Sequence, residues 1–121
     1  MHEMSIATSL MEQLQRIAAE RDARSITEVE VVCGVMQQVV PEALELAFET
    51  LAQDTLAASA TLRIIEEPLA GTCRGCEREY VPDLNDFRCP KCELADPELT
   101  AGQDIILKTV VMETDDKAAQ P

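Results

Sequence analysis

Aromatic residues are almost absent from this chain of 121 residues, which has no tryptophan and an aromatic content of 2%. The residues that do occur, Phe48, Tyr80 and Phe87, are too few to form a surface on which nucleic-acid bases stack. Positive charge is also scarce, since 10 Lys and Arg stand against 23 Asp and Glu, for a net charge of −13. Because phosphates are bound by clustered Lys and Arg, we expect no nucleic-acid partner.

Long apolar runs are missing as well. No stretch approaches the ~20 consecutive apolar residues that cross a bilayer, so we expect no membrane association. Near the N-terminus, Glu3, Glu12 and Arg16 interrupt any apolar segment of a signal peptide. We therefore expect a cytoplasmic protein in a reducing compartment, where thiols bind metals more often than they form disulfides.

Histidine occurs only once, at His2. A catalytic triad or a Cys–His pair needs a histidine inside the fold. The sequence also contains neither a P-loop nor a G-x-G-x-x-G motif. The composition therefore predicts a binding protein and not an enzyme.

The hydrophobic pattern predicts two helices and three strands. Apolar residues recur at spacings of three and four over residues 4–22 and again from Pro41 onward. Segments 26–33, 60–66 and 104–112 are strand-like. The last strand follows the cysteine region and has no other sheet to join, so we expect it to pair with the first two. The expected fold class is α+β, with two helices packed on a three-stranded sheet and an inserted four-cysteine zinc-ribbon module.

This order of elements predicts a discontinuous domain. Residues 1–68 together with 99–121 would form an α/β domain, and residues 69–98 would form the inserted metal-binding domain. The charged and small residues from about 115 onward predict a disordered tail.

Two C-x-x-C motifs, Cys73-Arg-Gly-Cys76 and Cys89-Pro-Lys-Cys92, are separated by twelve residues. Each two-residue gap lets both thiolates reach one ion, and two such knuckles supply the four ligands of a closed structural zinc site. Spacing alone leaves open disulfides, a redox motif or a rubredoxin-like iron site.

The N-terminus is a second candidate metal site. The Met1 amine, the His2 amide, the His2 imidazole and the Glu3 amide can wrap one ion in adjacent chelate rings. Nitrogen donors in a tetragonal arrangement suit Ni²⁺ or Cu²⁺. A histidine at position two is, taken alone, more often part of a solvated terminus.

The combination of these motifs resembles a known family. Its members carry a Met-His-Glu start that leads directly into an amphipathic helix, a Pro-containing helix start and paired knuckles. Met1-His2-Glu3, Gly34, Val40-Pro41-Glu42-Ala43-Leu44, Phe48-Glu49 and the two C-x-x-C motifs resemble the hydrogenase nickel-incorporation protein family HypA/HybF.

The resemblance implies a nickel metallochaperone for maturation of NiFe hydrogenase, and in some organisms of urease. It implies Ni(II) as transient cargo at Met1, His2 and Glu3, with the Glu3 side chain as a further candidate ligand. It implies structural Zn(II) at Cys73, Cys76, Cys89 and Cys92. The implied partners are the GTPase HypB and the hydrogenase large-subunit precursor, and we expect a monomer or weak homodimer.

The chain departs from the family pattern at two places. The residue after each knuckle is often glycine in the family, which suits a tight turn with positive φ, but here it is Glu77 or Glu93. After the first strand the family often has Gly-Glu-Leu, whereas this chain has Gly34 followed by Val35 and Met36. A carboxylate that would support the nickel site from that loop is missing.

A second hypothesis stays open at this point. The chain would then be a zinc-ribbon adaptor between proteins, with a structural metal and no nickel role. Cys33 is expected to be a small core residue and not a fifth ligand. Met4 is expected to pack at the helix start, although its thioether is a possible soft ligand.

Overall fold

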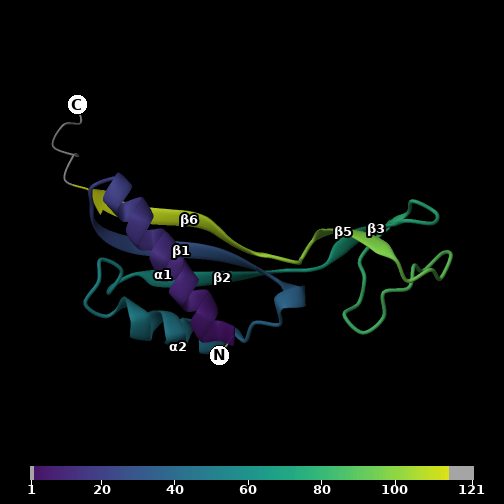
Figure 1. Cartoon of the computed structure of the whole chain (residues 1–121), viewed down its shortest axis with the longest axis horizontal. Helices are drawn as coiled ribbons and strands as arrows, with labels where there is room; N and C mark the ends of the chain where they lie inside the picture. Colours follow the sequence, from purple (N-terminus) through teal and green to yellow (C-terminus); the bar gives the residue numbers. More distant parts are fainter. Residues whose placement is uncertain (1, 115–121) are drawn as a thin grey trace. The chain divides into compact units, whose positions relative to one another are not determined.

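The computed structural model describes residues 2–114 (Figure 1). In chain order the elements are α1 (His2–Glu20), β1 (Ala23–Gly34), a 3-10 turn (Val35–Gln37), α2 (Pro41–Ala52), β2 (Thr61–Glu67), β3 (Ala70–Cys73), β4 (Glu79–Tyr80), β5 (Pro97–Ala101) and β6 (Ile105–Thr114). Met1 and the tail expected to be disordered from about 115 lie outside the described residues.

The chain divides into two compact units. Within the described residues, the first unit holds 2–31, 39–64 and 107–114. The second unit holds 32–38 and 65–106. The elements β3, β4 and β5 fall between β2 and β6 in the chain, so the cysteine region is an insertion, and the predicted α+β fold class is confirmed.

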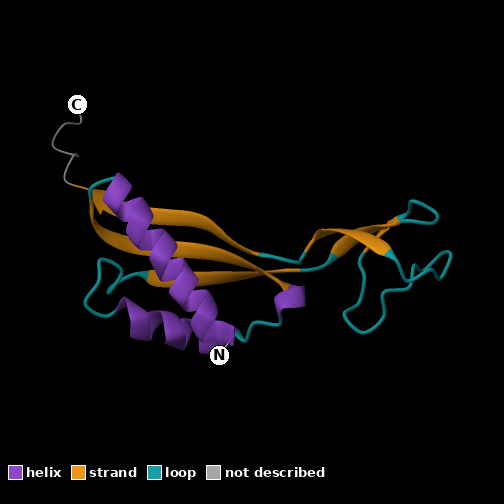
Figure 2. Ribbon diagram, in the orientation of Figure 1, coloured by secondary structure: helices purple, strands orange, loops and turns teal. Residues whose placement is uncertain are grey.

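The helices and the first sheet build the larger core. The sheet has the strand order β2–β1–β6, which confirms that the strand after the cysteine region pairs with the earlier strands. Every second residue of β1 from Val29 is buried, and Ile26 is also buried. In Figure 2 α1 crosses in front of this sheet, and α1 packs against α2. Leu14 and Phe48 are at most 1% exposed, and each such buried side chain contributes about 1.5–3 kcal/mol.

β1 and β6 run in opposite directions. The Thr27 hydroxyl donates to the Val111 carbonyl at 3.2 Å, and the Ser25 hydroxyl donates to the Glu113 carboxylate at 3.2 Å. As residue numbers rise along β1 the partner numbers fall along β6, which is the antiparallel arrangement.

α2 begins at Pro41, as predicted. Proline fits the first helical position because its missing N–H would have no acceptor inside the helix. Val40 is the N-cap residue, and its side chain forms no cap hydrogen bond. Its backbone N–H instead donates to the Glu3 carboxylate of α1 at 3.0 Å. This bond ties the start of one helix to the start of the other.

The predicted boundaries differ from the observed ones by a few residues. The helix expected over 4–22 begins at His2 and ends at Glu20. It stops because Asp22 adopts a left-handed conformation, with φ of 52°, which short polar residues tolerate. The first strand extends to Ala23, before the predicted start at 26.

The second unit contains a three-stranded sheet of order β4–β3–β5. β3 pairs antiparallel with both neighbours, with Gly71 opposite Tyr80 on one side and Thr72 opposite Glu98 on the other. In the same unit, the Glu67 carboxylate accepts the backbone N–H of Gly102 at 3.0 Å. This hydrogen bond joins Glu67, just before the inserted segment, to Gly102, just after it.

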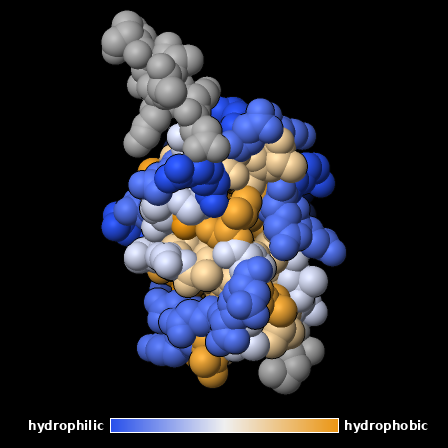
Figure 3. All heavy atoms as spheres, turned by 90° about the vertical axis from the view of Figure 1, so that its left-hand side faces the viewer, coloured by the Kyte–Doolittle hydropathy of each residue, from blue (hydrophilic) through white to orange (hydrophobic). Residues whose placement is uncertain are grey.

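Much of the surface seen in Figure 3 is hydrophilic, with hydrophobic residues between the charged ones. Among the described residues, no helix has the length and apolar character required to span a bilayer.

Gly34 and Gly102 make a close backbone approach. A Cβ atom on Gly34 would lie 2.4 Å from the carbonyl carbon and oxygen of Gly102. We predict that Gly34→Ala lowers the free energy of unfolding by about 1–3 kcal/mol, because backbone must move to make room. Chemical denaturation of the metal-loaded protein measures this. Ser59→Ala, at an exposed position, is the control, and equal stability of both variants would contradict the prediction.

Candidate metal centre

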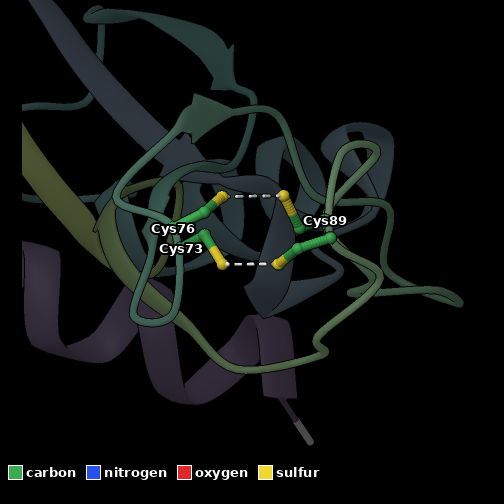
Figure 4. A group of neighbouring side chains, drawn as sticks. Cys73, Cys76 and Cys89 are labelled. Carbon is green, nitrogen blue, oxygen red and sulfur yellow. Dashed lines mark hydrogen bonds between the residues drawn. The ribbon is translucent and has the colours of Figure 1, made fainter.

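Four cysteine sulfurs converge in the second unit. The sulfurs of Cys73, Cys76, Cys89 and Cys92 all lie within 4.8 Å of one another. Cys73 Sγ is 3.4 Å from Cys92 Sγ, and Cys76 Sγ is 3.6 Å from Cys89 Sγ, so each short contact joins the two knuckles (Figure 4). None of the four forms a disulfide. The predicted zinc residues are therefore brought together at one point.

The two knuckles have the same backbone pattern. The Glu77 N–H donates to the Cys73 carbonyl and the Glu93 N–H to the Cys89 carbonyl, both at 2.9 Å. The N–H two residues after the first cysteine of each knuckle points at its sulfur at 3.4 Å, from Gly75 in one knuckle and Lys91 in the other. Backbone dipoles thus favour negative charge on both first cysteines.

The donor set fits a tetrahedral thiolate-bound ion. A zinc–sulfur distance of about 2.3 Å places the four sulfurs about 3.8 Å apart. The two short sulfur separations, 3.4 and 3.6 Å, are close to that value, and all four sulfurs lie within 4.8 Å of one another. Cys73 and Cys89 are buried, whereas Cys76 and Cys92 are exposed. When bound, the ion joins the two knuckles, and all four protein positions are used, so none remains open for a catalytic water.

Hydrogen bonding separates the pKa values of the thiols. The N–H of Cys92 is the main reason why the pKa of Cys89 falls to about 6. The N–H of Cys76 likewise lowers the pKa of Cys73. For Cys92 the N–H of Leu94 lowers the pKa, but hydrogen bonding with Cys73 and desolvation outweigh it and raise the pKa to about 11. The pKa values of Cys73 and Cys89, the buried cysteines of the two knuckles, are thus lowered, in the direction that metal binding by thiolates requires.

Both residues after the knuckles adopt a left-handed conformation. Glu77 has φ of 64° and Glu93 has φ of 66°. The tight turn expected after each knuckle is therefore present, but it is built with glutamate. A residue with a Cβ atom costs about 1–2 kcal/mol more than glycine in this region.

The loop between the knuckles is organised by short-range contacts. The Tyr80 hydroxyl donates to the Phe87 carbonyl at 2.6 Å, and Asp83 and Asp86 bridge each other through their backbones. The Arg88 guanidinium donates to both oxygens of Asp86 at 2.9 Å. That contact is the main cause of the low pKa of Asp86, about 2. Packing of the Tyr80 and Phe87 rings over the metal stays a prediction.

The N-terminal candidate site is described from His2 onward. His2 and Glu3 are the first residues of α1, whereas Met1 lies outside the described residues. The hydrogen bond from the Val40 N–H holds the pKa of the Glu3 carboxyl below its usual value. The hydrogen bond between the Val40 N–H and the Glu3 carboxylate was not predicted from the sequence. Pro41 marks residue 40 as the helix cap, but no local signal says which side chain reaches it.

Cys33 lies outside the sulfur cluster. Its side chain is 4% exposed, and burial raises the pKa of its thiol. Among the described residues, the cluster that could hold a metal contains only the other four cysteines. The structure thus agrees with a core role for Cys33.

The fold and the sulfur cluster define a metal-binding protein made of a helix-and-sheet unit with an inserted four-cysteine module. The family model described as hydrogenase/urease nickel incorporation, metallochaperone, hypA matches residues 1–112. The chain therefore belongs to the HypA family of nickel metallochaperones for hydrogenase maturation, and the predicted family is confirmed.

Individual relatives agree with this assignment. The hydrogenase maturation factor HypA of Wolinella succinogenes is 36% identical over 118 residues, covering 97% of this chain and 99% of that protein. The protein of the same name from Aquifex aeolicus is 36% identical over 115 residues, covering 95% of this chain and 100% of that protein.

The fold also matches a solved structure. The solution structure of the Ni metallochaperone HypA from Helicobacter pylori superposes with a TM-score of 0.71 and 27% sequence identity. The match covers 95% of this chain and 100% of that one. The architecture described above is thus that of a known HypA protein.

Replacing the left-handed glutamates should strengthen the metal centre. We predict that Glu77→Gly and Glu93→Gly each stabilise the metal-loaded protein by about 1 kcal/mol, because glycine adopts positive φ without a steric penalty. Thermal denaturation of the loaded protein and chelator competition measure the effect. Glu79→Gly is the matched control, since Glu79 lies in β4 and has no positive φ. It should destabilise, and stabilisation by all three variants would contradict the strain explanation.

Removing the Arg88 side chain should raise the pKa of Asp86. In Arg88→Ala the carboxyl loses its guanidinium partner but keeps the bond from the backbone N–H of residue 88, so the pKa should rise only part of the way from about 2 toward 3.8. A folded-state pKa below the unfolded value means that this contribution to stability is present above pH ~4 and is lost as the pH falls toward 2. NMR titration of the carboxyl carbon measures it. Arg78→Ala should leave the Asp86 titration unchanged.

Proposed function

We propose that this chain binds Ni(II) at its N-terminus and delivers it during maturation of NiFe hydrogenase. The proposed nickel ligands are the Met1 amine, the His2 amide and imidazole, and the Glu3 amide. The observation that supports this most directly is membership of the nickel-incorporation family together with a Met-His-Glu start.

The position of the motif at the start of α1 favours nickel binding by amide nitrogens. His2 and Glu3 are the first described residues of the helix. An α-helix offers no backbone acceptor to its first N–H groups. Metal binding by these amides therefore breaks no hydrogen bond of the helix, which an interior position of the same motif would require.

The Glu3 side chain has a different role in this proposal. Its carboxylate accepts the Val40 N–H and so holds the start of α1 against the start of α2. The carboxylate also places negative charge at the positive end of the α1 dipole, where a bound cation would otherwise be disfavoured. In this proposal the backbone nitrogen of Glu3 binds nickel, and its side chain accepts the hydrogen bond that joins the two helix starts.

The second metal is proposed to be zinc, held by Cys73, Cys76, Cys89 and Cys92. A closed four-thiolate site suits a structural ion, because the ion contributes to folding and leaves no open position for chemistry. The proposed functional domains are residues 1–68 with 99–121 for nickel and residues 69–98 for zinc. On this view the chain is a carrier and not an enzyme.

The proposed partners follow from the family role. The GTPase HypB would assist loading or release, and the hydrogenase large-subunit precursor would accept the nickel, in the cytoplasm. An exposed terminal site suits cargo that must leave. We propose no nucleic-acid or membrane partner, in line with the net charge of −13, and a monomer or weak homodimer.

Native mass spectrometry tests the metal assignments. The tag-free protein with an intact Met1 is titrated with Ni²⁺ beside His2→Ala. We expect one retained zinc and one added nickel in the parent protein, and loss of the nickel alone in the variant. A separate visible absorption spectrum of the purified protein, recorded before nickel is added, would reveal a ferric tetrathiolate and overturn the zinc assignment.

The hydrogenase readout separates a carrier from an adaptor. His2→Ala should abolish hydrogenase maturation in cells while the variant keeps its fold and its zinc. Thr8→Ala, further along the exposed part of α1, is the control and should mature hydrogenase normally. Zinc retention without His2-dependent nickel binding would favour the zinc-ribbon adaptor instead.

A further inference from the structure

The outer face of α2 carries three carboxylates around one exposed leucine. Glu42, Glu45 and Glu49 are all exposed, and their spacings of three and four place them on one side of the helix. Leu46 lies among them and is 66% exposed, the highest value for a large apolar side chain in the described part of the first unit. A single exposed leucine is common in proteins and does not by itself indicate a binding surface. The residues around Leu46 are therefore needed for that inference.

The stretch of sequence around α2 carries no positive charge. The sequence contains no Lys or Arg from residue 25 to residue 62. The last turn of α2 has no basic residue, and none of the three carboxylates forms an ion pair with another described residue. Like charges at these spacings destabilise an isolated helix by about 0.2–0.5 kcal/mol per pair. A basic partner would turn that repulsion into attraction.

A groove adjoins the same face. Two hollows of about 370 and 310 Å³ share Phe48, Glu49 and Ala60 in their lining. One wall is α2, the other is the segment 57–62 that leads into β2, and Glu45 stands at the edge. These volumes lie at the lower end of the range for binding pockets, about 300–1,000 Å³, and suit the insertion of individual side chains.

We propose that this groove and the adjoining face of α2 dock a partner protein through a basic segment with an apolar anchor. Lys or Arg side chains of the partner pair with Glu45 and Glu49, and the apolar side chain enters the groove over Phe48. A second copy of this chain is a poor occupant, because each copy carries a net charge of −13. The proposal does not depend on nickel binding.

The docking surface lies next to the start of α2, which contacts the N-terminal motif. α2 starts next to Val40, whose N–H is held by Glu3 of the N-terminal motif. α2 is 12 residues long, which corresponds to about 18 Å, so every part of its outer face lies within about that distance, along the helix, of Val40. Docking there would bring the partner near Val40, the residue that Glu3 of the N-terminal motif contacts.

NMR titration with defined peptides tests this docking surface. The probe is the peptide arginine–arginine–leucine–leucine–arginine–arginine, added to the isotope-labelled, metal-loaded protein. We expect amide shifts confined to residues 42–53 and 57–62. Replacing the leucines by serine, or the arginines by glutamate, should weaken binding at least about tenfold, because the site needs both charge and an apolar anchor.

A paired variant gives the decisive comparison. Glu45→Gln with Glu49→Gln should weaken the peptide about tenfold, whereas Glu12→Gln with Glu20→Gln on α1 removes the same charge and should change the affinity less than about twofold. Equal weakening by both pairs, or shifts spread over all acidic surfaces, would overturn the proposal, and so would Ni²⁺ producing the same shifts as the peptide. Thermal denaturation verifies that both pairs stay folded.

Discussion

The convergence of four thiols on one point is the constraint on which the inserted unit depends. The largest fully buried side chains of that unit are Leu69, Cys73 and Cys89, so two of the three are themselves in the sulfur cluster. Such a small apolar core contributes little free energy of folding. Negative sulfurs held within 4.8 Å of one another also repel when no cation is shared. An ion at this point would remove the repulsion and link two knuckles that are twelve residues apart, so metal binding would be coupled to the folding of this unit.

The first unit differs from the second in the source of its stability, which is the packing of apolar side chains. Phe48, Leu14 and the alternating residues of β1 form a core of buried apolar side chains. If nickel binds at the start of α1 as proposed, its loss or gain would leave this packed core intact, because the proposed ligands lie outside the core. The four-cysteine cluster lies in the other unit. The proposed cargo site and the apolar packing of the first unit would then depend on different interactions.

The elements with strong periodicity could be predicted from sequence, and so could the metal-ligand spacing. The alternation of Val29, Val31 and Cys33 identified a half-buried strand, and Pro41 marked a helix start, because both signals are local. The missed features are long-range. The Val40 N–H meets Glu3 only after two helices pack, and the contact between Gly34 and Gly102 joins positions far apart in the chain. The glutamates after the knuckles were noted as departures from the family pattern, but only the backbone shows that they keep the left-handed turn.

Those two left-handed glutamates have a consequence at the level of the gene. Either glutamate codon becomes a glycine codon through a change of its middle base, so the less strained turn is a single point mutation away at Glu77 and again at Glu93. Mutational access therefore does not explain why the chain has glutamate at both places. Glycine at either position would also keep the hydrogen bond that closes the knuckle, because that bond is donated by the backbone N–H of residue 77 or 93.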